Sequence, residues 1–373
     1  MPEIKLEHIT KRWGKFVGVK DMNLYIKDRG FVTLLGPSGC GKTTTLRMIA
    51  GLETPTEGKI TIGDTVVFDS SEGINVPPAK RNVGFLFQNY ALWPHMSVYD
   101  NVAFGLKNLK WKKEDIDKRV YELLEMLKIS QFAKRYPNEI SGGQQQRVAI
   151  ARTLAPSPKV LFMDEPLSNL DAKLRLEMRS ELKRLHLDTN STFVYVTHDQ
   201  LEAMTLATEV CLIKEGVIQQ YEAPLQLYTY PKNIFVADFV GNPTMNFIDS
   251  QAKEIKPMEF EVDFAGVKTM FIPNEPMKLK SSNVVLGIRP EYIKIVKDSN
   301  IKGKVYATLP AGMETTIKFR INDQIMTSVV FGIIDFKLDS EIAIDFIGTN
   351  VCLFDKDTGE SLGLGKLVNC SQK

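Results

Sequence analysis

The sequence has few cysteines, and they do not form a pattern. Cys40, Cys211, Cys352 and Cys370 lie far apart among 373 residues, without the short spacings that hold a metal ion. This distribution argues against a disulfide-stabilised scaffold and against a zinc site. It is typical of a protein from a reducing compartment.

The sequence also lacks a long apolar run and a strong excess of one charge. No stretch approaches about 20 uninterrupted apolar residues, and the N-terminal Met-Pro-Glu-Ile-Lys holds no apolar core of a secretory signal. We therefore expect a cytosolic chain, unless a partner holds it at a membrane. The formal net charge of +2 gives no basic footprint, so we expect no nucleic-acid partner.

The composition is that of a globular protein, with 43% apolar and 25% charged residues, and the length suggests about two domains. Over roughly the first 235 residues, apolar runs at 31–35, 160–163 and 193–196 predict buried strands separated by helices, hence a parallel sheet covered on both faces. A mostly helical insertion is predicted over about residues 89–155. Its clearest signal is a set of apolar residues at helical spacing, namely Ile116, Val120, Leu123, Leu124 and Leu127.

The character of the sequence changes near Pro243. Short alternating runs follow, such as 317–321 and 341–346, and they are broken by Gly, Asp and Asn. Strands at short, regular spacing predict a small β-barrel or sandwich in this part of the chain.

A phosphate-binding pattern, Gly36-Pro-Ser-Gly-Cys-Gly-Lys42-Thr43, stands between a predicted strand and a predicted helix. Its glycines let successive N–H groups converge on phosphate oxygens, and the helix adds the positive end of its dipole. Lys42 can reach the β- and γ-phosphates, and the Thr43 hydroxyl can bind magnesium. The alternative to a phosphate-binding loop is an ordinary glycine-rich turn. Within the loop, Cys40 is either a small residue that presents its N–H or a redox switch. The residues expected to contact ATP here are Ser38, Gly39, Cys40, Gly41, Lys42, Thr43 and Thr44.

An acidic pair, Asp164-Glu165, follows the apolar run 160–163. Taken alone, the pair could be a solvated strand end. Together with the phosphate-binding pattern it predicts that Asp164 binds magnesium and that Glu165 activates the attacking water, since a carboxylate beside a γ-phosphate can act as a general base.

Between these two motifs lies Ile140-Ser-Gly-Gly-Gln144, followed by a run at helical spacing up to Arg152. Ser and Gly at a helix start leave N–H groups and a hydroxyl that can meet an anion, although they can also form a simple helix cap. With the other motifs, this segment resembles the signature motif of the ABC ATPase family, with Ile140 where the family usually has Leu.

The resemblance implies a site for ATP and Mg²⁺ that two chains share. Trp13 matches the aromatic residue that stacks on adenine, the alternative being an ordinary surface or core aromatic. Gln88 matches the glutamine that touches magnesium and water and senses the membrane partner, and His198 matches the switch histidine at the γ-phosphate. The implied catalytic residues are Glu165, His198 and Gln88, and the implied metal ligands are Thr43, Gln88 and Asp164. The implied ATP contacts outside the phosphate loop are Trp13, Ser141, Gly143, Gln144 and Asp171. Asp171 ends the segment 168–171, which resembles the D-loop of the family.

The resemblance covers essentially the whole chain and implies its domains. Residues 1–238 would form an α/β P-loop ABC ATPase domain with a helical subdomain at about 89–155. Residues 239–373 would form an all-β, oligonucleotide-binding-fold (OB)-like regulatory and dimerisation domain. Three segments of the tail resemble the maltose- and multiple-sugar-importer ATPases, namely 235–241, 243–247 and 287–291.

The function that this resemblance implies is ATP hydrolysis that energises a binding-protein-dependent importer of a mono-, di- or oligosaccharide. Its partners would be a second ATPase subunit, two integral membrane permease subunits and, indirectly, an extracytoplasmic solute-binding protein. The chain would lie on the cytoplasmic face of the membrane. The segment 88–101 resembles the region that receives the coupling helix of the permease. Its groove residues, or else ordinary packing residues, are Tyr90, Leu92, Trp93 and Met96.

Other functions share the same motifs. The same machine could import iron, a polyamine, sulfate or glycerol phosphate. A soluble ABC protein that remodels DNA or ribosomes usually carries coiled coils or two cassettes, and this chain shows one cassette and no sustained heptads. A regulatory scaffold built on the tail could coexist with transport.

Overall fold

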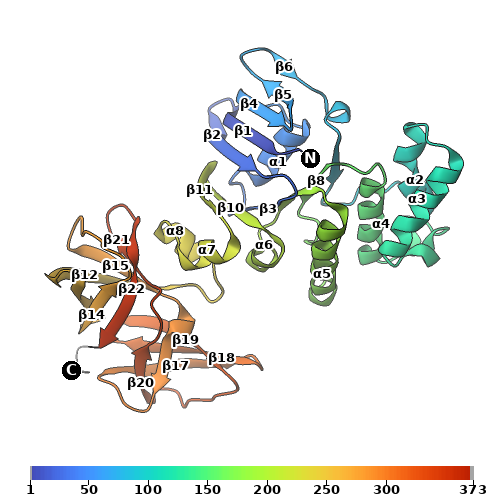
Figure 1. Cartoon of the computed structure of the whole chain (residues 1–373). Helices are drawn as coiled ribbons and strands as arrows, with labels where there is room; N and C mark the ends of the chain where they lie inside the picture. The colour runs from blue at the N-terminus through green and yellow to red at the C-terminus, as the bar shows by residue number, and fades with distance from the viewer. Residues whose placement is uncertain (1, 370–373) are drawn as a thin grey trace. The chain divides into compact units, whose positions relative to one another are not determined.

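The computed structural model describes residues 2–369 and divides into two compact units, Met1–Pro224 and Leu225–Lys373 (Figure 1). No helix in this described range is long and apolar enough to cross a bilayer. Cys40, Cys211 and Cys352 are buried free thiols, and Cys370 lies outside the described residues.

The first unit is built on a six-stranded sheet in the order β11-β10-β3-β9-β8-β7, in which only the pairing of β10 with β11 is antiparallel. Every residue of β3, β8 and β9 is buried, which explains their continuous apolar sequences and confirms the three predicted strands. The strands are β3 (Phe31–Leu35), β7 (Val83–Leu86), β8 (Val160–Asp164), β9 (Thr192–Val196), β10 (Glu209–Lys214) and β11 (Val217–Glu222).

A second, antiparallel sheet of the first unit has the order β2-β1-β4-β5-β6. Its strands are β1 (Ile4–Trp13), β2 (Phe16–Ile26), β4 (Glu57–Ile62), β5 (Thr65–Asp69) and β6 (Ile74–Asn75). One hydrophobic core joins apolar residues of this sheet, of the six-stranded sheet and of helix α1 (Lys42–Ala50). Helix α1 is therefore held firmly behind the loop that precedes it.

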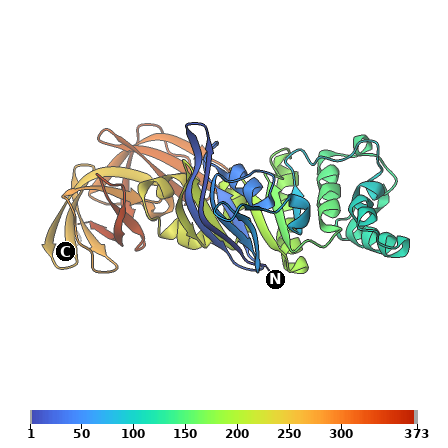
Figure 2. The same cartoon turned by 90° about the horizontal axis from the view of Figure 1, so that it is seen from above.

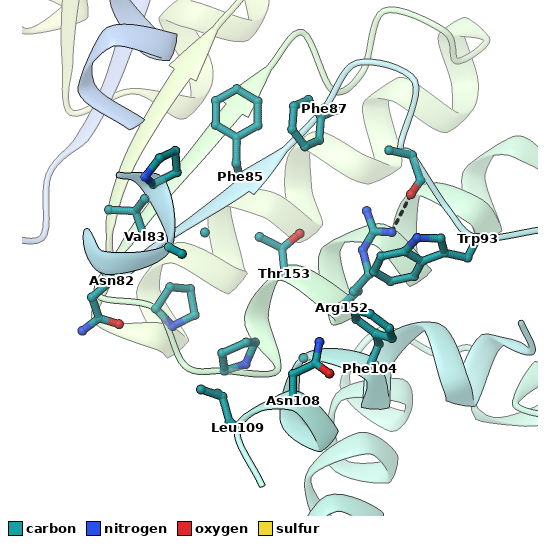
Figure 3. A pocket seen from close by; sticks show the side chains of 17 residues that line it. Asn82, Val83, Phe85, Phe87, Trp93, Phe104, Asn108, Leu109, Arg152 and Thr153 are labelled. Atoms are coloured by element: carbon teal, nitrogen blue, oxygen red, sulfur yellow. Dashed lines mark hydrogen bonds between the residues drawn. The ribbon is translucent and has the colours of Figure 1, made fainter. Parts of the chain in front are cut away.

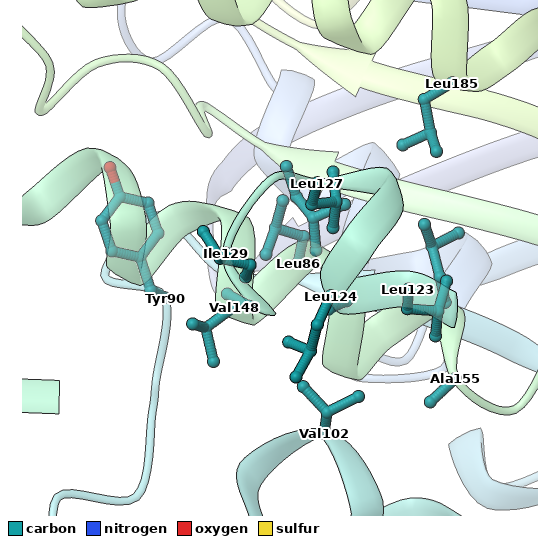
Figure 4. Packing of buried hydrophobic residues seen from close by; sticks show 14 of the residues in the cluster. Leu86, Tyr90, Val102, Leu123, Leu124, Leu127, Ile129, Val148, Ala155 and Leu185 are labelled. Atoms are coloured by element: carbon teal, nitrogen blue, oxygen red, sulfur yellow. The ribbon is translucent and has the colours of Figure 1, made fainter. Parts of the chain in front are cut away.

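The predicted helical insertion contains α2 (Val98–Asn108), α3 (Lys113–Met126) and α4 (Gly142–Leu154). Along α3, the buried residues are Ile116, Val120, Leu123 and Leu124, which confirms the apolar face predicted from their spacing. These helices share one core with α5 (Ala172–Thr189) and the adjoining strands (Figure 4). Figures 1 and 2 show α2, α3 and α4 gathered together, away from α1.

Helix α5 packs on the sheet through an uncommon core residue, His186. Its ring lies against Phe31 and Phe193 at centroid distances of 5.3 and 5.0 Å, and its Nε2 lies 3.0 Å from the Arg29 carbonyl oxygen. Burial lowers the pKa of His186. The neutral ring is therefore the form that the folded chain favours.

The second unit is mostly β-structure, as predicted for this part of the chain. It contains a closed barrel, β12-β13-β14-β22-β21-β15, and a five-stranded antiparallel sheet, β16-β20-β17-β18-β19. The barrel strands are β12 (Asn246–Lys256), β13 (Glu259–Phe264), β14 (Val267–Pro273), β15 (Asn283–Ile288), β21 (Val351–Asp355) and β22 (Ser361–Asn369). The sheet strands are β16 (Ile293–Val296), β17 (Ile301–Pro310), β18 (Glu314–Ile321), β19 (Gln324–Phe331) and β20 (Glu341–Phe346).

Arg289 fastens the helices α7 (Pro224–Thr229) and α8 (Ile234–Phe239) to this unit. The side chain is almost fully buried, and its guanidinium donates to the carbonyl oxygens of Tyr228, Ala237 and Val240. The division between the units falls after Pro224, the first residue of α7, whereas the boundary expected from the sequence, residue 238, lies within α8.

Candidate nucleotide-binding site

Four loops of the first unit follow neighbouring strands of the six-stranded sheet. Lys42 follows β3, Gln88 follows β7, Asp164 ends β8 with Glu165 directly after it, and His198 follows β9. Because these strands are parallel, their carboxyl ends share one edge of the sheet, which is where ligands bind in such folds. The topology thus collects residues that are more than 150 positions apart in the sequence, as the range from Lys42 to His198 shows (198 − 42 = 156).

The loop between β3 and α1 requires glycine at two tight positions. The φ angles of Gly36 and Gly41 are 151° and 102°. A Cβ atom at Gly36 would lie 2.1 Å from the carbonyl oxygen of Ile213, and one at Gly41 would lie 2.7 Å from that of Gly18. No side chain fits at either place, so at these two positions the loop presents only backbone.

Positive charge gathers at the start of α1. The cap residue Gly41 contributes no side-chain bond, and the first turn holds no acidic residue, so nothing within that turn neutralises the helix dipole. Lys42 is only 6% exposed, and its Nζ donates to the carbonyl oxygens of Gly36 and Pro37 at 2.7 and 2.8 Å. A backbone cradle with a buried ammonium and a helix N-terminus is suited to a phosphate group.

Cys40 is buried beneath this loop, with its Sγ 3.8 Å from Lys42 Nζ. Burial raises the pKa of the thiol, which opposes formation of the reactive thiolate. The structure therefore favours the small packing residue over the redox switch. Around it, Ser38 and Gly39 are exposed, and Thr43 and Thr44 are half-buried.

Asp164 links the end of β8 to α1. Its buried carboxylate accepts a hydrogen bond from Thr43 Oγ1 at 2.9 Å, and it lies 3.3 Å from a guanidinium nitrogen of Arg47. Arg47 was not among the residues predicted from the sequence. Its position four residues after Thr43, on the same face of α1, is the signal that could have revealed it.

Glu165 and His198 meet across the ends of β8 and β9. Glu165 has a positive φ of 44°, and its N–H donates to the Val196 carbonyl oxygen at 3.1 Å, which turns the residue away from the strand. Its Oε2 lies 3.3 Å from Nδ1 of His198, whose side chain is 59% exposed. The carboxylate is thus held beside a solvent-facing imidazole.

Gln88 is tied to the loop that follows Glu165. Its Nε2 donates to Ser168 Oγ at 3.4 Å, and its carbonyl oxygen accepts from Asn169 Nδ2 at 3.1 Å. Asp171 ends this loop as the N-cap of α5 and accepts from the N–H of Leu174 at 3.0 Å. Asp171 therefore has a capping role within its own chain.

Ser141, Gly143 and Gln144 stand at the start of α4. Ser141 and Gln144 form a reciprocal capping box, because the Ser141 N–H donates to Gln144 Oε1 at 2.9 Å and the Gln144 N–H donates to Ser141 Oγ at 3.5 Å. The structure does not bring these residues to the loop around Lys42, because α4 lies with α2 and α3, away from α1 (Figures 1 and 2).

Trp13 ends β1 and is 44% exposed. Its ring stacks at 22° on Phe16, with the centroids 6.2 Å apart, and Lys11 Nζ lies 5.2 Å from it. A Cβ at Gly18 would lie 2.5 Å from the Trp13 ring, so this glycine provides the space in which the ring lies. Trp13 is therefore a surface aromatic residue.

Comparison with known proteins identifies the family of this chain. The family model described as ABC transporter matches residues 19–168. The trehalose/maltose import ATP-binding protein MalK of Thermococcus litoralis is 40% identical over 375 residues, which cover 97% of this chain and all of that protein. The chain belongs to the ABC transporter family. It is therefore an ATP-binding protein and an ATPase.

Two further comparisons extend this assignment. The ABC ATPase is 45% identical over 324 residues to the maltose/maltodextrin import ATP-binding protein MalK of Salmonella typhimurium, and the match covers 86% of each chain. Among solved structures, the dimeric post-hydrolysis state of the ATP-binding cassette MJ0796 bound to ADP and Pi has a TM-score of 0.52 and 35% identity. It covers 59% of this ABC ATPase and 98% of its own chain.

The ABC ATPase has a second notable surface, a groove of about 650 Å³ between the end of β7 and the helices α2 and α4 (Figure 3). Trp93 and Phe104 lie together in it, with ring centroids 4.3 Å apart, and the Arg152 guanidinium stacks 4.7 Å from Trp93. The groove is lined by Pro78, Ala79, Asn82, Val83, Gly84, Phe85, Phe87, Ala91, Trp93, Phe104, Gly105, Asn108, Leu109, Arg152, Thr153, Pro156 and Pro158.

Only one of the four groove residues expected from the sequence lines this groove. Trp93 does, whereas Tyr90 is buried in the core and Leu92 packs against that core. Met96 is half-buried and does not line the groove. Asn101 anchors the segment that carries them, because its side chain bonds with both the N–H and the carbonyl oxygen of Trp93, at 2.9 and 3.1 Å.

Proposed function

We propose that this ABC ATPase energises a binding-protein-dependent importer, and that its cargo is a mono-, di- or oligosaccharide. The observation that carries the proposal is the meeting of the four motif-bearing loops at one edge of the parallel sheet, in a chain whose similarity to a trehalose/maltose import protein runs through both units. An isolated cassette would not need the second unit, and the similarity extends well beyond the cassette.

The site residues divide the chemistry of phosphoryl transfer. Lys42 and the N–H groups of residues 38–43 bind the phosphates, and Trp13 stacks on the base. Glu165 takes a proton from the attacking water, while His198, 3.3 Å away, orients the carboxylate and faces the transferred phosphoryl group. Gln88 contributes to positioning the water from the neighbouring loop. Such a reaction depends mainly on positioning and on charge stabilisation.

The residues at the end of β8 fit Mg²⁺. Thr43 and Asp164 supply two hard oxygen ligands whose oxygens lie 2.9 Å apart. The described residues hold no group of three or more His, Cys, Asp or Glu side chains able to bind a metal. Thr43, Asp164 and Gln88 would hold the ion, and phosphate oxygens of the nucleotide would complete its set of ligands. When bound, the ion neutralises charge on the phosphates. The Thr43 hydroxyl and the Arg47 guanidinium hold the Asp164 carboxylate in place before the ion binds.

Two copies of the chain complete two sites. The start of α4 carries Ser141, Gly143 and Gln144 but lies away from α1 of its own chain (Figures 1 and 2). The matched cassette structures are dimeric, and one of them holds ADP and Pi. Ser141 and its neighbours thus contact the nucleotide of the partner chain, together with the D-loop that ends at Asp171. Hydrolysis then depends on closure of the dimer.

The groove beside β7 receives the permease. Its walls are largely aromatic and proline side chains around Trp93, and its volume of about 650 Å³ suits a short helix bearing a few apolar anchors. Arg152 and Asn101 hold the rim in place through hydrogen bonds to backbone atoms. Because Gln88 lies in the loop between this groove and the site, docking reaches the reacting groups directly. The chain accordingly sits at the cytoplasmic face of the membrane, bound to two permease subunits, and the solute-binding protein acts from the other side.

The second unit is the regulatory and dimerisation part. Its closed barrel and antiparallel sheet support an OB-like, all-β architecture. Its own core and its own fastening of α7 and α8 allow it to act as a body separate from the ATPase unit.

The proposal is tested by purifying the assembled transporter with its binding protein, reconstituting it in vesicles, and measuring ATP hydrolysis with a panel of solutes. Stimulation by maltose, trehalose or another sugar supports both the transport role and the cargo. Stimulation by iron, a polyamine, sulfate or glycerol phosphate keeps the machine and replaces the cargo. A chain that purifies without a permease and hydrolyses ATP unchanged by any solute contradicts the transport role.

A further inference from the structure

A buried carboxylate stands behind the loop that carries the switch histidine. Glu202, in the first turn of α6 (Gln200–Leu206), is only 3% exposed. Its Oε2 accepts hydrogen bonds from the hydroxyls of Tyr195 and Thr197, at 2.8 and 2.6 Å. Tyr195 belongs to β9, and Thr197 immediately precedes His198. Glu202 itself lies in α6, so its carboxylate joins the strand before the switch loop (residues 197–199) to the helix after it.

This carboxylate is expensive to bury, because an ionised group in a protein core loses its hydration. Burial accordingly raises the pKa of Glu202, although the hydrogen bonds from Thr197 and Tyr195 oppose that shift. Both hydroxyls bond to Oε2. The other carboxylate oxygen, Oε1, faces a charged neighbour.

That neighbour is Arg175, on the first turns of α5. Its Nε lies 4.0 Å from Glu202 Oε1, and its Nη1 lies 3.7 Å from Asp199 Oδ2. Its Nη2 donates to the carbonyl oxygen of Leu170 at 3.0 Å. One guanidinium thus contacts both acidic residues beside the switch loop and the backbone of the D-loop.

Leu174, the residue before Arg175, extends this arrangement to α4, the signature helix. A Cβ at Gly143 would lie 2.3 Å from Leu174 Cδ2, which means that Leu174 packs directly against the start of α4. The first turn of α5 therefore contacts three segments at once. They are the signature helix through Leu174, the D-loop through Asp171 and Leu170, and the switch loop through Arg175.

We infer that Glu202 and Arg175 are positioning residues that hold the loop of His198 in a fixed arrangement with the D-loop and the signature helix. In the dimer, the signature helix serves the nucleotide of the partner chain. The pair therefore links a subunit's own switch histidine to the segment that it contributes to the other site. This inference rests on the function proposed above and adds two residues that contact no substrate.

The test compares variants of the assembled, reconstituted transporter. Glu202→Gln keeps the size of the side chain and an acceptor for both hydroxyls but removes the charge that faces Arg175. Arg175→Gln removes the cation, and Arg175→Lys restores it without the planar fork. The matched control is Asp69→Asn, because the buried Asp69 also accepts from a hydroxyl, that of Ser71 at 2.6 Å, and pairs with Lys59 at 3.4 Å, but lies in β5 of the other sheet.

We expect kcat for ATP hydrolysis to fall at least tenfold in Glu202→Gln and in Arg175→Gln, since small misplacements of catalytic groups reduce rates steeply. The dissociation constant for a fluorescent ATP analogue should stay within about twofold of the parent, because neither residue contacts the nucleotide. Arg175→Lys should recover at least threefold of the kcat lost in Arg175→Gln. Asp69→Asn should keep the parental kcat.

Two results would overturn the inference. One is a kcat within twofold of the parent in both variants. The other is a loss of kcat that comes with an equal fold-loss of ATP-analogue affinity, or with a lower melting temperature, and that Arg175→Lys does not reverse. That pattern indicates a merely structural role. If Glu202→Gln does not fold, the two Arg175 variants decide, because that side chain is 32% exposed and its removal empties no core. A failure of the proposed function is recognised separately, by a parent protein that does not hydrolyse ATP, and it removes both proposals.

Discussion

Replacing Glu165 by Gln should stop ATP hydrolysis while leaving the fold and the nucleotide site intact. The substitution preserves the volume and planarity of the side chain. The positive φ of 44° and the N–H bond to the Val196 carbonyl oxygen are backbone features that Gln can retain. What disappears is the basic oxygen that lies 3.3 Å from His198 Nδ1.

The two expected magnitudes differ enough to be separated. A general base typically contributes about 10²–10⁴-fold, so kcat should fall by that factor, equivalent to about 3–5 kcal/mol of barrier. The contact between Glu165 and His198 contributes little to folding, because the His198 side chain is 59% exposed and even fully charged surface pairs are worth about 0–1 kcal/mol. A change of that size shifts the melting temperature of a domain this large by less than about 4 °C.

The assay is a single-turnover measurement of phosphate release, with thermal unfolding and ATP-analogue binding measured on the same preparation. The variant should bind ATP as the parent does and should accumulate as a closed dimer on size-exclusion chromatography with ATP. Release of phosphate at a rate within threefold of the parent would remove Glu165 from its role. A loss of ATP binding would instead show that the substitution damages the phosphate cradle.

Four further outcomes are expected. Lys42→Ala should lower affinity for a fluorescent ATP analogue at least tenfold by titration, since a buried ammonium leaves the cradle; equal binding would contradict the phosphate-loop assignment. Ser141→Ala should reduce hydrolysis in the dimer while the isolated chain still binds ATP, and a lost monomer affinity would contradict a site shared between chains. Trp93→Ala should abolish solute stimulation of the reconstituted ATPase and leave its basal rate, whereas parental stimulation would place the permease elsewhere. Because burial lowers the pKa of His186, the unfolded state binds its proton more readily, so the free energy of unfolding should fall as pH drops below about 6.5, by up to about 1.4 kcal/mol per unit; urea titrations at pH 7.5 and 5.5 should show a smaller fall in His186→Leu.

The local patterns were the features most readily predicted from the sequence. Continuous apolar runs gave β3, β8 and β9 nearly to the residue, because strands buried on both faces are filled mainly by apolar side chains. Thr33, Asp164 and Thr192 are the buried polar exceptions. The glycines of residues 36–43 could also be interpreted directly, since Gly36 and Gly41 have positive φ and no room for a Cβ. The apolar runs and the positive φ angles are local features, whereas the clashes that exclude a Cβ come from the distant Ile213 and Gly18.

The features that the sequence did not predict depend on contacts between distant segments. Glu202 appears in the sequence as an ordinary helix residue, and only the packing of α6 against β9 buries it beside Tyr195. The burial of Arg289 likewise depends on carbonyl groups about 50 residues away, which no local pattern announces. The groove around Trp93 requires β7, α2 and α4 together, and so three of its four expected residues point elsewhere or into the core.

The order of strands in the six-stranded sheet has a consequence for the chain while it is being made. Both neighbours of β3, namely β9 and β10, come more than 150 residues after it (192 − 35 = 157). A ribosome that has translated only as far as α5 therefore carries a mostly apolar strand with two unpaired edges, and edges of this kind recruit other chains. Translation pauses or chaperone shortage before Thr192 should thus favour aggregation, whereas the same stress after β10 should do little harm.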